Sequence, residues 1–218
     1  MFKKFTIIGF FAFLLAANSF AQEKSAIKQS TETASNPVVY GIVVDNSGSY
    51  RMLLDKIVET VKDIVEENKA DDQTFLVRFV DSEKIRLSQD LTNSKTQIRD
   101  AADEMYIEGG LTAILDAVDF SARYLAENYA GANSNRRKIL ILITDGDDRQ
   151  SKTKIEEVLK FLKSEKIQVY AIGLSDEKIS TKILDKLAKE TNGKIYTPKN
   201  RAETKTIVKE LATAIRGQ

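Results

Sequence analysis

Three short segments of the sequence carry clustered oxygen-bearing side chains that could hold a metal ion. The first is Asp45-Asn46-Ser47-Gly48-Ser49, in which one carboxylate and two hydroxyls alternate along the chain. The second is Gly109-Gly110-Leu111-Thr112, and the third is Thr144-Asp145-Gly146. Alternating residues of a tight loop can point to one side, so these oxygens could converge on one hard cation.

The composition narrows the chemistry that the chain can perform. Its 218 residues include no cysteine and no histidine, which excludes thiol nucleophiles, Ser-His-Asp catalysis and every metal site built on thiolate or imidazole. Oxygen ligands remain, and they favour Mg²⁺, Mn²⁺ or Ca²⁺ over Zn²⁺ or Cu²⁺. The 33 basic and 32 acidic residues balance. Because a phosphate backbone is bound through a basic excess, we expect no nucleic-acid partner.

Each of the three segments also has a purely structural interpretation. Ser47, Ser49 and Thr112 belong to residue types that often cap helices. Asp145-Gly146 is typical of a turn. Capping and turn formation would explain each loop taken alone. They would not explain why two predicted buried strands both end at an aspartate.

The three segments lie where predicted strands end and helices begin. Apolar, often β-branched runs predict strands at 38–44, 74–80, 138–144, 167–174 and 194–197, with 84–87 as a hairpin partner. Apolar stripes predict helices at 51–68, 94–105, 112–128, 151–164, 180–191 and 203–216. This alternation predicts an α/β fold with a doubly wound, mostly parallel sheet flanked by helices on both faces. Such folds bind ligands beyond the carboxyl ends of their strands.

The first 21 residues are typical of a secretory signal peptide. Lys3 and Lys4 give a positive start, residues 5–17 are almost wholly apolar, and the small residues at 19 and 21 suit cleavage after Ala21. A helix of that apolar length spans only about 20 Å, against about 30 Å of hydrocarbon, so we favour cleavage over a retained anchor. We expect a signal peptide at 1–21, a flexible leader at 22–36 and a domain at 37–218. The protein would be secreted or periplasmic, without stable membrane insertion.

In this order and context, the three segments resemble the metal-ion-dependent adhesion site of von Willebrand factor type A domains. The resemblance runs from about Pro37 to the C-terminus, and it is similar in detail to a bacterial secreted subgroup at residues 43–49, 75–79, 109–113 and 169–174. It implies the Rossmann-like fold of that family. It also implies that Ser47 and Ser49 bind the metal directly.

The same resemblance assigns the other candidate residues. Thr112 would bind the metal directly or through water, while Asp45 and Asp145 would act mainly through water and as charge compensation. The implied cofactor is a divalent cation, above all Mg²⁺, with Mn²⁺ and Ca²⁺ as alternatives. The implied partner is a protein whose acidic side chain completes the metal coordination.

We therefore expect a binding module rather than an enzyme, and two other functions compete with it. A Mg²⁺-dependent phosphohydrolase could use Asp45 as an aspartyl nucleophile, with Asp147 and Asp148 as metal ligands. A haloacid-dehalogenase-like enzyme would, however, need an acid/base aspartate where this chain has Ser47. The other alternative is a metal-free structural domain that contacts proteins through its helix faces.

Overall fold

The structure is a computed structural model that describes residues 36–48, 52–129, 136–175 and 179–217. These residues belong to one compact unit, Asn36–Gln218. The predicted signal peptide and nearly all of the predicted leader lie outside the described residues, as does Ser49. No helix in the described ranges is long and apolar enough to cross a membrane.

A six-stranded sheet forms the centre of this unit, with the strand order β3-β2-β1-β4-β5-β6. The strands are β1 (Val38–Asp45), β2 (Gln73–Phe79), β3 (Ile85–Thr92), β4 (Arg137–Thr144), β5 (Ile167–Gly173) and β6 (Ile195–Tyr196). Every neighbouring pair is parallel except β2 with β3, which is antiparallel. The strand order reverses between β1 and β4, so the predicted doubly wound fold is confirmed.

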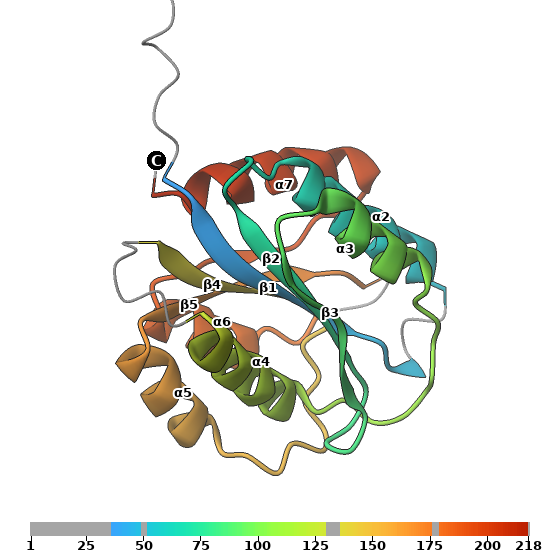
Figure 1. The fold of residues 1–218 in the computed structure, drawn as a ribbon. Helices are drawn as coiled ribbons and strands as arrows, with labels where there is room; N and C mark the ends of the chain where they lie inside the picture. The colour runs from blue at the N-terminus through green and yellow to red at the C-terminus, as the bar shows by residue number, and fades with distance from the viewer. Residues whose placement is uncertain (1–35, 49–51, 130–135, 176–178, 218) are drawn as a thin grey trace, which may run out of the picture. The chain divides into compact units, whose positions relative to one another are not determined.

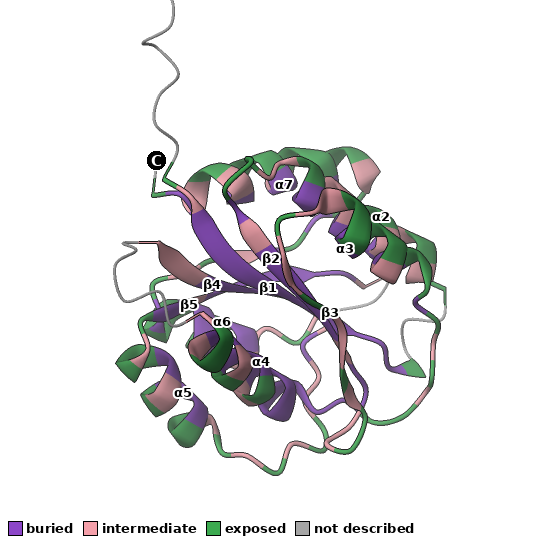
Figure 2. Ribbon diagram, viewed as in Figure 1, coloured by how far each residue is buried: buried purple, intermediate pink, exposed green. Residues whose placement is uncertain are grey.

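Helices cover both faces of the sheet, as Figure 1 shows. One face carries α2 (Leu54–Glu66), α3 (Lys95–Asp103) and α7 (Arg201–Ala214). The other carries α4 (Ile114–Asn128), α5 (Ile155–Ser164) and α6 (Lys182–Glu190). Strands β1, β2, β4 and β5 are mostly buried between these layers, whereas the edge strand β3 has no buried residue and the outer sides of the helices are exposed (Figure 2).

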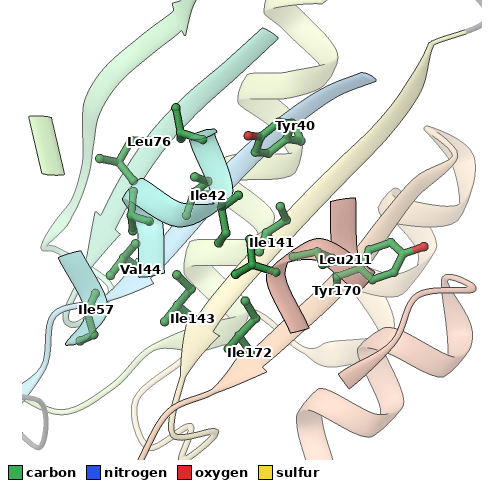
Figure 3. Close-up of a cluster of buried hydrophobic side chains, with 14 of the residues drawn as sticks. Tyr40, Ile42, Val44, Ile57, Leu76, Ile141, Ile143, Tyr170, Ile172 and Leu211 are labelled. Carbon is green, nitrogen blue, oxygen red and sulfur yellow. The ribbon is translucent and has the colours of Figure 1, made fainter. Parts of the chain in front are cut away.

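Two hydrophobic cores hold the layers together, because successive side chains of a strand point to opposite faces of the sheet. On the first face, Ile42 belongs to the same core as Ile57 of α2 and Leu211 of α7 (Figure 3). On the second face, Val43 belongs to the core that includes Val118 of α4. The central strand β1 is therefore buried along its whole length, which holds its carboxyl end in place.

The structure corrects some of the predicted element bounds. The hairpin partner expected at 84–87 is the longer strand β3, which pairs with β2 as far as Thr92. Helices α2, α4 and α5 begin at Leu54, Ile114 and Ile155, two to four residues later than expected. For α4 and α5, the reason is that the preceding residues form hydrogen bonds with other segments.

Candidate metal site

The ends of β1 and β4 place two of the candidate segments side by side. The two strands are adjacent and parallel, and their register pairs Val44 with Ile143. The Thr144 hydroxyl donates a hydrogen bond of 2.7 Å to Oδ2 of Asp45. The loop after β1 and the loop after β4 therefore leave the sheet at the same edge, as the sequence predicts.

Asp45 is a fully buried carboxylate beneath the first loop. Its Oδ1 accepts a hydrogen bond of 3.0 Å from the backbone N–H of Ser47, and its Oδ2 accepts the bond from Thr144. Burial raises the pKa of this carboxyl to about 7, hydrogen bonds from Thr144 and Ser47 oppose the rise, and the charge of Asp145 adds to it. No lysine or arginine of the described residues forms a salt bridge with Asp45. A bound cation would compensate its charge.

Three of the five predicted residues line one small cavity. Ser47, Thr112 and Asp145 form its walls together with Gly110, Leu111, Asp147 and Arg149, and its volume is about 70 Å³. A water molecule occupies about 30 Å³ of the liquid, so the cavity has room for an ion and one or two ligand groups. Asp45 is bonded to the backbone of the cavity-lining Ser47. Ser49 lies outside the described residues.

The helix-capping interpretation is wrong for the two described hydroxyl residues. The N-cap positions of α2 and α4 are Leu53 and Ala113, and neither makes a side-chain capping bond. The first N–H groups of α4 donate instead to the loop after β4. The backbone N–H of Ile114 donates to Asp148 Oδ1 (2.7 Å), and that of Leu115 donates to Ser151 Oγ (2.9 Å). Thr112 therefore does not serve as the cap of α4.

The Gly-Gly loop is held against the loop after β1. The side-chain amide of Asn46 donates to the carbonyl oxygen of Tyr106, and its backbone N–H donates to Phe79 (2.8 Å). Gly110 has a φ of +141°, and a Cβ there would lie 2.5 Å from a methyl carbon of Val80. Only glycine fits this position without strain. These contacts bring Thr112 to the cavity.

Several acidic residues near the cavity have roles that could not be predicted from the sequence. Asp148 caps α4, and the cavity-lining Asp147 pairs with Arg149, so both carboxylates considered as ligands of a phosphohydrolase already have a partner. Asp116, on the first turn of α4, is largely buried and accepts hydrogen bonds from the backbone N–H groups of Lys152 (2.9 Å) and Thr153 (2.7 Å). A long-range backbone contact of this kind leaves no periodic signal in a sequence.

The turn predicted at Asp145-Gly146 is not found, because residues 145–149 form neither a turn nor a bend, although the backbone at Gly146 favours glycine. Gly146 has a φ of +84°, and a Cβ there would lie 1.8 Å from the carbonyl oxygen of Ser180. The backbone N–H of Ser180 donates to the carbonyl oxygen of Asp145 at 2.9 Å. The segment before α6 therefore fixes the backbone of Asp145 at the cavity.

Two hydroxyls, of Ser47 and Thr112, and two carboxylates, of Asp145 and Asp147, line the cavity. In the part of the chain that the structure describes, no group of three or more acidic, histidine or cysteine side chains is placed to hold a metal ion. Hydroxyl, carboxylate and water oxygens are ligands that suit Mg²⁺, which retains several waters. The residues present therefore fit a hard divalent cation bound with few direct negative charges.

This fold and cavity define a doubly wound α/β domain with an oxygen-lined site at the switch in strand order. The model of the von Willebrand factor type A domain matches residues 41–210. The chain therefore belongs to the von Willebrand factor type A domain family, as its sequence motifs predict.

Proteins similar to this chain occur in both eukaryotes and bacteria. Inter-alpha-trypsin inhibitor heavy chain H2 of Mus musculus is 28% identical over 161 residues, which cover 69% of this chain and 17% of that protein. The chain thus spans less than a fifth of this curated relative.

Two bacterial structures share the fold. A von Willebrand factor type A protein from Catenulispora acidiphila has a TM-score of 0.70 at 18% identity, covering 84% of this chain and 43% of the other. An aerotolerance-related membrane protein from Bacteroides fragilis has a TM-score of 0.68 at 18% identity, covering 83% of this chain and all of the other.

Proposed function

We propose that this protein is a non-enzymatic binding module that engages a protein partner through a divalent cation. Domains of this family commonly bind such an ion at a metal-ion-dependent adhesion site. Ser47, Ser49 and Thr112 would hold the ion, with Asp45 and Asp145 acting through water. An acidic side chain of the partner would complete the coordination.

One observation carries this proposal. Ser47, Thr112 and Asp145 line a single cavity, and the buried Asp45 accepts a hydrogen bond from the backbone of Ser47. A buried carboxylate without a cationic neighbour is costly. A cation in the adjacent cavity lowers that cost. Because the proposed direct ligands are neutral hydroxyls, the ion would keep much of its charge and attract a carboxylate from outside.

The competing functions fit the site less well. A phosphohydrolase would need a proton donor at position 47 and free metal carboxylates, whereas Asp147 and Asp148 are engaged in other contacts. A metal-free structural domain would have no use for hydroxyls gathered above a buried carboxylate. We further propose that the protein is exported, with cleavage after Ala21, and acts in the periplasm or outside the cell.

A calorimetric titration with Mg²⁺ tests the metal site. Wild-type protein should bind the ion, and Ser47→Ala should weaken binding at least tenfold. Thr213→Ala, at an exposed position of α7, is the matched control and should bind as wild type does. Partner binding is tested by capture of secreted proteins from the native host with Mg²⁺ and with chelator. Equal capture in both buffers would overturn the proposal.

A further inference from the structure

Among the described residues that line the metal cavity, Arg149 is the only positively charged one. It lies in the loop after β4, and 60% of its side-chain surface is exposed. Its guanidinium is therefore accessible to a ligand that enters the cavity from solvent. Arg149 is not among the proposed metal ligands, so the proposed function assigns it no role.

The backbone of Arg149 is tied to the loop that carries Thr112. The N–H of Arg149 donates to the carbonyl oxygen of Thr112 at 2.8 Å, and the N–H of Gln150 donates to the same oxygen at 3.0 Å. On the same loop, Asp148 and Ser151 cap the first turn of α4. Arg149 and Thr112 are therefore held at fixed positions relative to each other.

The guanidinium itself is held at one side only. Its Nε donates to Oδ2 of Asp147 at 2.6 Å, and its Nη2 pairs with the same oxygen. The backbone N–H of Asp147 donates in turn to Oδ1 of Asp145 at 3.2 Å. Arginine offers five N–H groups. The Nη1 group of Arg149 contacts no hydrogen-bond acceptor within the described ranges, so it can serve a ligand.

A carboxylate in this cavity would meet the cation and the guanidinium of Arg149, beside the carboxylates of Asp145 and Asp147. One of its oxygens would complete the coordination of the cation, which leaves the second oxygen without a partner. The cavity has room for one carboxylate head beside an ion, since its volume is about 70 Å³ and a water molecule takes about 30 Å³. A hydrogen bond between guanidinium and carboxylate is roughly twice as strong as one between neutral groups.

We propose that Arg149 determines specificity by binding the second carboxylate oxygen of the acidic side chain whose first oxygen binds the cation. The inference rests on the proposed function and adds a residue to it. A neutral amide of the same shape would lose the attraction to two positive charges, that of the cation and that of Arg149. The partner therefore presents a glutamate or aspartate side chain rather than glutamine or asparagine.

The test uses a minimal probe with one carboxylate, the α-amide of N-acetylglutamate, and the matching glutamine compound as the neutral control. Each is titrated into Mg²⁺-saturated protein, and binding is followed by NMR at the backbone amides of residues 45–48 and 110–112. We expect the glutamate compound to bind wild type and the glutamine compound to bind at least tenfold more weakly. Arg149→Gln should weaken binding of the glutamate compound about tenfold, because one charge-assisted hydrogen bond is lost.

Two further measurements separate this role from a structural one. Without probe, Arg149→Gln should bind Mg²⁺ no more weakly than wild type, because the substitution removes a positive charge beside the cation. Arg149→Lys should restore part of the probe affinity because the charge returns. Arg123→Gln removes another exposed Arg–Asp pair, on α4, and should change nothing.

Different outcomes would overturn the role of Arg149 and the proposed metal site. Unchanged probe affinity in Arg149→Gln, or loss of Mg²⁺ binding in that variant, would overturn the role of Arg149 and leave the proposed metal site standing. Failure of the wild type to bind Mg²⁺ would overturn the proposed function and this inference with it.

Discussion

Replacing Asp45 with asparagine should remove a large part of the pH dependence of stability in the metal-free domain. Burial raises the pKa of this carboxyl to about 7 in the folded chain, while the unfolded chain has the usual value of about 3.9. A raised folded pKa contributes stability that is fully present below the unfolded pKa and is lost as the pH rises through the folded pKa. The wild-type contribution therefore falls between about pH 4 and pH 7, whereas asparagine stays neutral throughout.

The magnitude follows from the two pKa values. The shift of about three pKa units corresponds to about 4 kcal/mol over the full range, at about 1.4 kcal/mol per unit. Between pH 5 and pH 8 the wild-type domain should lose about 2–3 kcal/mol of this stability. Asp45 is fully buried, so solvent screening does not reduce this figure. Asparagine retains an acceptor for the N–H of Ser47 and can donate to the hydroxyl oxygen of Thr144.

Urea unfolding at pH 5, 6, 7 and 8 in chelator measures the effect. The difference in unfolding free energy between Asp45→Asn and wild type should move by about 2–3 kcal/mol in favour of the variant from pH 5 to pH 8. Asp71→Asn, at an exposed aspartate, should run parallel to wild type. A constant difference between Asp45→Asn and wild type across this range would refute the reasoning. It would mean that the buried carboxyl does not titrate near neutrality.

Three further predictions follow from the site. Thr112→Ala should lower the unfolding free energy by no more than about 1 kcal/mol, because Thr112 does not cap α4, and should abolish Mg²⁺-dependent capture of the partner; intact capture would contradict this. Asp148→Ala should destabilise the domain by about 1–3 kcal/mol in urea unfolding, because it leaves the N–H of Ile114 without its acceptor, whereas an unchanged midpoint would argue against that cap. N-terminal sequencing of the protein from its native host should begin at Gln22, and an intact Met1 on cytoplasmic protein would exclude export.

Much of the fold can be predicted from the sequence because its signals are local. The continuous apolar run at 38–44 specifies a strand buried on both faces, and the apolar stripe on α2 specifies which side of that helix faces the sheet. The strands, the helices and the parallel sheet therefore follow from patterns within a few residues of each other. The order of the three candidate loops along the chain can also be read from the sequence.

The composition of the cavity wall could be predicted only in part. Ser47, Thr112 and Asp145 were recognisable because they stand at strand–helix junctions. Arg149 was not, because its place depends on two hydrogen bonds to the carbonyl of Thr112, a residue far away in the sequence. The role of Asp148 as the cap of α4 could not be predicted for the same reason.

The alternation of strands and helices, the family motifs and the absence of thiol and imidazole chemistry all follow from the sequence alone. The electrostatics of the site depend on the folded structure. Asp45 is a strand-end carboxylate in the sequence, and only the packing of β1 between two helical layers removes it from water and raises its pKa. Burial and cross-loop hydrogen bonds depend on which distant segments meet, and no pattern of neighbouring residues encodes that meeting.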